Sequence, residues 1–456
     1  MSVSEPLATR NLVLIALAAA LSLCIGVAAG VSPRYGVAGA LGVTFAVAVV
    51  ADVTLGLFLF TMLSFLEVVD AGSGALSFIK VAGLILFVSW LAAQATRSQR
   101  ESRSLLASSP GVAIPVILFV SWSVISMVWA VSSGKAASST ERFVLDALLF
   151  PIVFGAIRRR DDIRWIVAAF VLGAVLSAGI GLLQSGGARL AGGIGDPDGE
   201  AALLSAALML DFGLIATLRR GSTPRSLAIL GAVIMAIGLV DTGSRGGLVA
   251  LGAGLVAAVL FGGQWRGRAV QVALVAAVLV PFYLFVLAPS AAVQHLNENT
   301  TSGRTDLWKV GLKMLQTNPV LGVGAGNFQV AESQYVQQVG AITRADIIVD
   351  APRVTHDTYL ELADELGIPG LLAFLAIALG SISCALRAAR LYEGAGDPSL
   401  GLLARMIAIG LIALLTADIF ISNEYEHLLW LLLSLPPAVL AVARSETKAE
   451  TSALAR

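Results

Sequence analysis

Long apolar runs separated by short polar segments repeat along almost the whole chain. An apolar run of about 20 residues is the length that a helix needs to cross the hydrocarbon core of a bilayer. By this criterion the sequence predicts about 14 spans, at 11–31, 36–51, 53–69, 76–95, 112–130, 139–157, 163–184, 199–218, 225–241, 246–262, 268–288, 367–390, 402–421 and 424–443. The pattern therefore predicts an all-α, polytopic transmembrane helical bundle.

Two of these regions are less regular than the rest. The spans at 36–51 and 53–69 are short and only Asp52 divides them, so the total would fall to about 12 if the pair did not cross separately. The first run, 11–31, is longer than the apolar region of a usual signal peptide and has no clear small-x-small cleavage site. We therefore interpret it as a membrane span.

Composition supports the membrane class. The 456 residues are 57% hydrophobic and 13% charged, with a mean hydropathy of +0.86, whereas a soluble domain averages about 25% charged residues. The formal net charge is zero, so the location of the charges carries more information than their sum. Cys24 and Cys384 both lie in apolar runs and indicate neither a disulfide framework nor a metal site.

The arginine-rich loops define an orientation. If the N-terminus is cytoplasmic, every loop with several arginines falls on the cytoplasmic side, as the positive-inside rule requires. These residues are Arg97, Arg100, Arg103, Arg158, Arg159, Arg160, Arg164, Arg219, Arg220, Arg225, Arg266, Arg268, Arg387 and Arg390. We therefore expect three parts: an N-terminal bundle of about 11 spans over 1–288, an external and mostly helical loop over 289–366, and C-terminal transmembrane helices with a cytoplasmic tail over 367–456.

The external loop contains a predicted amphipathic helix. It starts at a turn near Ser302, places Leu307, Val310 and Met314 along one edge, and ends at Asn318, because the residue before a proline avoids the helical region. Such a helix between spans is expected to lie along the membrane face. Arg304 falls at its N-terminus, where backbone N–H groups already converge on anions.

Two further features of the loop differ in what they indicate. The glycine-rich turn GVGAGN at 322–327 has neither the spacing nor the preceding strand of a nucleotide-binding loop, so we read it as a tight backbone turn. His356 precedes a helix-like run that ends at a Gly-Ile-Pro-Gly break, 367–370, a setting that would hold its imidazole at the mouth of the bundle. A lone loop histidine is otherwise more often structural or solvated.

Two arginines lie in short loops predicted to be external, where the positive-inside rule does not account for them. They are Arg189 in GGARLAGGIGDPDGE and Arg245 in DTGSRGG. The structural alternative is that each lies at the membrane interface or pairs with a nearby carboxylate, at Asp196, Asp198 or Asp241. The functional alternative is an anion site.

Three motifs in a fixed order resemble a known family. SRGG follows a span, GRTDLWK with NPVLGVGAGNF begins the loop, and THDTYLELADELGIPGLLAFL ends it. Together they resemble the bacterial O-antigen ligase and polymerase superfamily of polytopic membrane glycosyltransferases, most densely over 185–380. This chain departs from the family where Asp357 follows the histidine in place of asparagine, and where Asp-Pro-Asp, 196–198, replaces an NPN-like turn.

The resemblance implies a site and a reaction. It assigns Arg245 and Arg304, with Arg189 as a weaker match, to the pyrophosphate of a polyprenyl (undecaprenyl) carrier, and His356 to catalysis. It implies a GT-C-like fold and an inverting transfer of glycan to an acceptor hydroxyl at the outer face of the bacterial cytoplasmic membrane. A carrier-linked sugar is already activated, so we expect no nucleotide. The first outer loop, VSPRYGV, has no paired carboxylates or metal-ligand cluster, so we expect no metal. We also expect no other cofactor and no nucleic-acid partner. The partners are the donor, a glycan, lipid or protein acceptor, and membrane lipid.

Several alternatives stay open on the sequence. Within the superfamily, the protein could be a ligase, an O-antigen or exopolysaccharide polymerase, or a protein O-oligosaccharyltransferase. In a different class, it could be a transporter or flippase of lipid-linked sugars, which should show inverted repeats and ionisable groups in mid-membrane. We find no convincing repeat, and the spans are nearly free of charge away from their ends. A membrane scaffold is the remaining alternative.

Overall fold

The computed structural model describes residues 26, 30, 33–66, 78–96, 103–288, 290–297, 303–340, 342–343, 345–350 and 352–454, and these residues form helices and no strand. The first helices are α2 (Pro33–Ala51), α3 (Val53–Leu63), α4 (Phe78–Thr96), α5 (Leu105–Ser108), α6 (Pro110–Ser126), α7 (Ser133–Ala147), α8 (Leu149–Ala156), α9 (Arg160–Gln184), α10 (Pro197–Thr217), α11 (Thr223–Asp241) and α12 (Arg245–Phe261). They are followed by α13 (Arg266–Val286), α14 (Ser290–Asn297), α15 (Arg304–Thr317), α16 (Phe328–Tyr335), α17 (Asp346–Val349), α18 (Thr358–Gly394), α19 (Pro398–Ala417) and α20 (His427–Leu454).

The predicted fold class is confirmed. Seven helices in the described part of the chain are long and apolar enough to cross a membrane, and five shorter apolar helices accompany them. The predicted span at 11–31 lies outside the described residues except for Gly26 and Gly30. The protein is therefore a multi-pass helical membrane protein.

The prediction of one span at 139–157 was wrong in detail. The structure divides this stretch into α7, which begins earlier at Ser133, and α8, with the break at Leu148. Pro151 explains the break, because it lacks the N–H that would bond the carbonyl of Ala147.

The short pair at 36–69 forms two separate helices. Asp52 is extended and caps α3, accepting hydrogen bonds from the N–H groups of Thr54 and Leu55 at 2.7 and 3.4 Å. The same residue lines a cavity with Arg158 and Arg159, so the junction lies at the predicted cytoplasmic end. With 11 residues, α3 is only about 16 Å long, shorter than the bilayer core.

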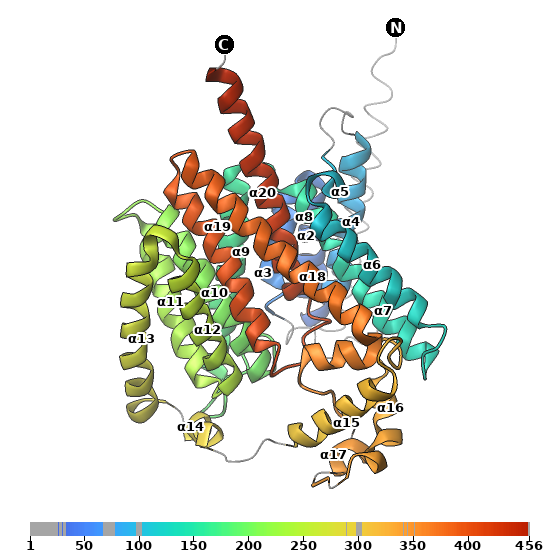
Figure 1. Cartoon of the computed structure of the whole chain (residues 1–456). Coiled ribbons are helices and arrows are strands. Elements are labelled where there is room, and N and C mark those ends of the chain that lie inside the picture. The colour runs from blue at the N-terminus through green and yellow to red at the C-terminus, as the bar shows by residue number, and fades with distance from the viewer. Residues whose placement is uncertain are drawn as a thin grey trace.

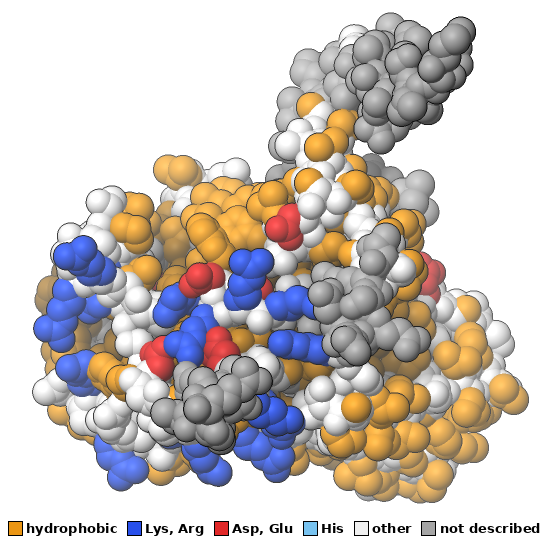
Figure 2. Space-filling view, turned by 90° about the horizontal axis from the view of Figure 1, so that it is seen from above, with side chains coloured by type: hydrophobic (Ala, Val, Ile, Leu, Met, Phe, Trp, Pro, Cys, Tyr) orange, Lys and Arg blue, Asp and Glu red, His pale blue; other side chains and the backbone are white. Residues whose placement is uncertain are grey.

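The two ends of the bundle differ in character. Helices α14 to α17 lie at the end opposite the C-terminal end of α20 (Figure 1). The end from which α20 emerges displays many Lys and Arg side chains (Figure 2). There Arg160 forms ion pairs with Asp397 at 3.3 Å and with Glu446 at 2.9 Å. This is the distribution expected if that end faces the cytoplasm.

A central group of helices forms the buried core. Helix α10 packs closely along α19, and a side chain at Gly213 would meet Leu403 and Met406. Small residues at such crossings allow backbones to approach closely, which favours helix association in membranes. Helix α18 also packs on α19 and α20, so the core fixes the position of the residues just before α18.

The segment between α13 and α18 has a small core of its own. Leu307, Val310 and Met314 of α15 are buried, as predicted, and pack with Val323, Phe328, Ala331, Tyr335 and Ile348. The helix ends at Asn318 as predicted, but its N-cap is Gly303, with φ of 82°, and not Ser302, which lies outside the described residues. Glycine adopts this left-handed conformation without a steric cost.

The glycine-rich turn at 322–327 ties this segment to the bundle. The Glu365 carboxylate of α18 accepts hydrogen bonds from the N–H groups of Gly326 at 2.6 Å and Phe328 at 3.1 Å. The Asn327 side chain accepts a bond from the N–H of Ser132 at 2.7 Å. Farther along α18, Gly367 has non-helical angles, φ 69° and ψ −178°, so the predicted break at 367–370 is present as a kink inside a longer helix.

Candidate functional site

The candidate site lies at the end of the bundle that carries α14 to α17 (Figure 1). It is assembled from chain segments that are far apart in sequence: the turn before α10, the start of α12, the start of α15, and the residues that precede α18. The first turns of α10, α12 and α15 all contribute. Helix N-termini carry a partial positive charge and unpaired N–H groups, so their convergence favours an anion.

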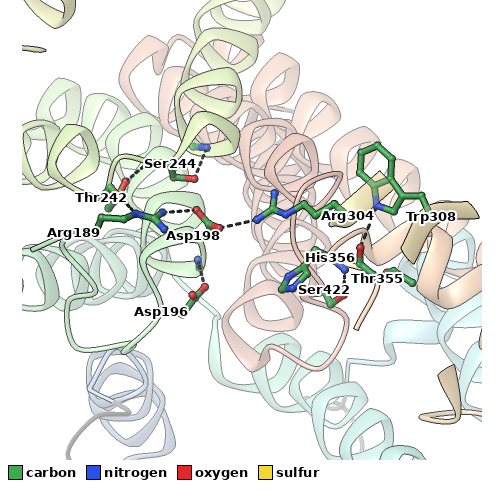
Figure 3. Close-up of polar contacts among 12 residues, drawn as sticks. Arg189, Asp196, Asp198, Thr242, Ser244, Arg304, Trp308, Thr355, His356 and Ser422 are labelled. Carbon is green, nitrogen blue, oxygen red and sulfur yellow. Dashed lines mark hydrogen bonds and ion pairs between the residues drawn. The ribbon is translucent and has the colours of Figure 1, made fainter. Parts of the chain in front are cut away.

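Asp198 joins two of the predicted arginines (Figure 3). Arg189 donates from Nη2 to Asp198 Oδ1 at 2.9 Å, and Arg304 donates from Nη2 to Asp198 Oδ2 at 2.9 Å. Arg189 also donates from Nε to the carbonyl of Thr242 at 2.7 Å. The pairing of Arg189 with Asp198, weighed from the sequence as a structural alternative, is thus present, and the same carboxylate also holds Arg304.

Local structure fixes the bridging carboxylate. Asp196 caps α10 by accepting the N–H of Gly199 at 2.7 Å, and Pro197 occupies the first turn. Both residues favour the start of a helix. Asp198 therefore lies on the first turn of α10, where it faces the two guanidinium groups. The carboxylate that binds both arginines is therefore held by the first turn of a helix.

The charges at this centre do not cancel. Two guanidinium groups face one carboxylate, and the side chains remain partly accessible, at 24% for Arg189, 26% for Arg304 and 19% for Asp198. A guanidinium has five N–H donors, and the contacts with Asp198 and Thr242 use a minority of them. The arrangement leaves positive charge and donor capacity for a further anion.

Arg245 lies at the same end, as the first residue of α12. Ser244 caps that helix by accepting the N–H of Gly247 at 3.2 Å, and the Ser244 hydroxyl also interacts with Asp198. The side chain of Arg245 is exposed. The structure thus brings together Arg189, Arg304 and His356. Arg245 directly follows Ser244, whose hydroxyl interacts with Asp198.

His356 occupies the other side of Arg304 (Figure 3). Its imidazole is half-buried, and burial, together with the nearby Arg304 guanidinium, lowers its pKa below the ordinary value of 6.5. The carboxylates of Asp198 and Asp196 act in the opposite direction but are the smaller influence. The imidazole is therefore neutral near pH 7, the form that can accept a proton.

The backbone at His356 is unusual. Among the described residues it is the only non-glycine residue with a positive φ, at 53°. Its N–H donates to Ser422 Oγ at 3.0 Å, and the preceding carbonyl, of Thr355, accepts a bond from Trp308 Nε1 at 3.1 Å. The left-handed conformation turns the chain sharply between the outer segment and α18.

Sequence reasoning missed the residues that organise the site. It considered Asp198 as a possible partner of Arg189, but not as the group that joins Arg189 to Arg304. It gave no role to Ser422 or Glu361. The available signal was the polar run SNEYE at 422–426, which stands between two spans on the predicted outer side.

A cavity of about 940 Å³ lies next to this site. It reaches Val354, Glu361 and Ser422, and it extends between α4, α7 and the residues before α20. Charged side chains of both signs line it, namely Lys80, Lys135, Arg142, Asp146, Glu424 and Glu426. Its volume is in the upper part of the range of about 300–1,000 Å³ that is usual for small-ligand pockets.

The carboxylates near the arginines are engaged by N–H donors. Asp196 caps α10 and Asp198 is bound by the two guanidinium groups. In the part of the chain that the structure describes, no group of three or more His, Cys, Asp or Glu side chains is arranged to hold a metal ion.

Fold and site together define a class, the polytopic helical membrane proteins with a cluster of arginines paired to a carboxylate at one end of the bundle. A family model described as O-Antigen ligase matches residues 230–375, a range that contains Arg245, Arg304 and His356 but not Arg189. An O-antigen ligase of Pseudomonas aeruginosa is 28% identical over 350 residues, which cover 74% of this chain and 78% of that protein. Over these residues the chain is similar to O-antigen ligases.

Proposed function

We propose that this protein is a glycosyltransferase that moves a glycan from a polyprenyl-pyrophosphate carrier to an acceptor hydroxyl. The similarity to O-antigen ligases supports a glycan-transfer function at a membrane. The observation that carries the finer proposal is the convergence of Arg189 and Arg304 on Asp198 beside His356.

The arginines suit a pyrophosphate. Guanidinium groups are always charged and can form two parallel hydrogen bonds with phosphate oxygens. When the bond between the anomeric carbon and the phosphate oxygen breaks, negative charge grows on the leaving pyrophosphate. Guanidinium groups that are already oriented stabilise this charge most strongly in the transition state. Asp198 supplies that orientation by holding both side chains in place before the donor arrives.

His356 suits the acceptor. The neutral imidazole takes a proton from the acceptor hydroxyl while that oxygen forms its bond to the anomeric carbon. The polyprenyl pyrophosphate leaves from the opposite side, so the anomeric configuration is inverted in one displacement. A base of this kind contributes a factor of about 10²–10⁴ to the rate. The lowered pKa of His356 favours the form that this step requires.

We place the reaction at the outer face of the bacterial cytoplasmic membrane, without a metal or a nucleotide. The basic residues at the opposite end of the bundle support this orientation (Figure 2). The ion pairs of Asp198 support metal independence, because each of its oxygens is bound by an arginine. An acceptor on a lipid A core, as in a ligase, is the leading version. The alternative acceptors are a second carrier-linked glycan and a protein hydroxyl. The experiment below distinguishes the three acceptors.

The test is transfer by the purified protein. It is supplied with a defined glycan on polyprenyl pyrophosphate and, in parallel, with a lipid A core, a second carrier-linked glycan or a hydroxyl-bearing peptide. The proposal expects a new glycosidic bond on one acceptor and release of the carrier pyrophosphate. A protein that moves the intact donor across a vesicle membrane but forms no new bond would instead be a transporter.

A further inference from the structure

The backbone of His356 is held from one direction by the connection between α19 and α20. Ser422 in this connection accepts a hydrogen bond from the His356 N–H at 3.0 Å. The Ser422 hydroxyl in turn donates to the Glu361 carboxylate, which lies one helical turn inside α18. His356 is thus linked through one hydroxyl to a buried carboxylate.

The same carboxylate also holds the residue before His356. Glu361 Oε2 accepts hydrogen bonds from the Thr355 hydroxyl at 3.0 Å and from the Thr355 N–H at 3.3 Å. Glu361 itself is 2% exposed. Two of its three donors belong to Thr355 and the third is the Ser422 hydroxyl, so a single buried group holds both the residue before His356 and the residue that His356 contacts.

Further hydrogen bonds attach the connection firmly to the start of α18. The Thr358 N–H donates to the carbonyls of Asp418 at 2.9 Å and Ile421 at 3.0 Å, and the Thr358 hydroxyl donates to Ile421 at 2.8 Å. The Asn423 N–H donates back to that hydroxyl at 2.8 Å. Because this connection is so constrained, Ser422 has little freedom to follow His356 if the histidine moves.

The backbone conformation that these contacts hold is one that residues other than glycine rarely adopt. At φ 53°, His356 is in the left-handed region, where residues other than glycine persist only if the surroundings fix them. In that conformation the imidazole is directed to the side of Asp198 and Arg304 (Figure 3). Return to an ordinary conformation would redirect it.

We infer that Ser422, oriented by Glu361, is a positioning residue that keeps His356 in the left-handed conformation and so aims its imidazole at the arginine site. The inference deepens the proposed function and rests on it. It attributes the orientation of the proposed base, His356, to two residues that do not themselves contact the substrate. Ser422 and Glu361 act through His356.

The experiment compares Ser422→Ala with Ser381→Ala in the purified full-length protein. Ser381 is the matched control, because its hydroxyl also joins two helices, donating to the Leu433 carbonyl at 2.7 Å, but on the bundle side of the kink in α18. The inference expects Ser422→Ala to lower kcat by up to about 10²-fold, as a small misplacement of a catalytic group can do. It expects KM for the carrier-linked donor to stay nearly constant and Ser381→Ala to keep the wild-type kcat.

A double-mutant cycle shows whether Ser422 acts through His356. In a His356→Ala background, Ser422→Ala should cause no additional loss, because the group that it positions is absent. Glu361→Gln keeps an oxygen that can accept from Ser422 and Thr355, and should retain more activity than Glu361→Ala. Equal kcat for Ser422→Ala and Ser381→Ala, or full additivity in the cycle, would overturn the inference. Wild-type transfer by His356→Ala alone would instead overturn the proposed function. Failure of the inference and failure of the proposed function therefore give different results.

Discussion

Arg304 and Asp198, 106 residues apart in the sequence, form an ion pair of 2.9 Å that joins the first turn of α15 to the first turn of α10. The contact connects the segment between α13 and α18 to the membrane bundle at the point where the proposed donor phosphates bind. Arg189 approaches the same carboxylate from the turn before α10. The basic centre is therefore assembled by an acidic residue.

The first prediction concerns that acidic residue. Asp198→Ala should impair transfer by about 10-fold or more, because the two guanidinium groups lose the carboxylate that orients them before the donor binds. Asp198→Asn, which can still accept hydrogen bonds, should be less affected. The measurement is kcat/KM for the carrier-linked donor, with Asp161→Asn as control, since Asp161 pairs with Arg164 at an exposed site. Improved transfer by Asp198→Ala would show that the carboxylate competes with the donor.

The arginines give a second prediction. Arg189→Ala and Arg304→Ala should each lower transfer by on the order of 10²-fold, the effect of removing one donor to a developing negative charge. Lysine at either position should restore little, because it lacks the planar fork of N–H groups. Arg245→Ala should also impair transfer if its exposed guanidinium reaches the donor.

Donor binding and steady-state rates together separate these roles. Arg164→Ala is the control, because it removes a partly exposed arginine, paired with Asp161, at the opposite end of the bundle. An alanine variant of Arg189, Arg245 or Arg304 that keeps wild-type rates at both low and saturating donor would remove that residue from the proposed site.

Features that depend on local sequence patterns could be predicted, whereas contacts between residues far apart in the sequence could not. Hydropathy and proline signals are local, so the membrane helices and the C-terminal end of α15 were predictable. Arg304 and His356 stood out in short motifs. The break at Leu148 was also local, but the signal of Pro151 was not used. The Ser422–Glu361 link and the Arg304–Asp198 contact join residues that are 61 and 106 positions apart, so both depend on helix packing. No local pattern encodes that packing.

The electrostatic surroundings of His356 give a third prediction, for pH dependence. The base must be deprotonated, so kcat should rise with pH through an apparent pKa below 6.5 and then reach a plateau. Arg304 lowers the pKa of His356, so a neutral residue at 304 should move the rising limb to higher pH. Asp198 raises that pKa, so Asp198→Asn should move the limb to lower pH. Shifts in the same direction for both variants would contradict this assignment.

Orientation is the fourth prediction. Ser333 on α16 is exposed in the segment proposed to be external, and Ser399 begins α19 at the proposed cytoplasmic end. In a protein whose Cys24 and Cys384 are replaced by serine, Ser333→Cys should react with an impermeant thiol reagent added to intact cells. Ser399→Cys should react only after the membrane is opened. The reverse pattern would place the proposed site in the cytoplasm.

The measurement that tests the central claim most directly is single-turnover transfer by His356→Gln, with donor binding measured on the same preparation. Glutamine can satisfy a structural hydrogen bond but cannot serve as a base. We expect transfer to fall by about 10²–10⁴-fold while the dissociation constant of the carrier-linked donor stays close to that of the wild type. Transfer by His356→Gln at the wild-type rate would show that His356 only holds the chain in place, and would contradict its role as the base.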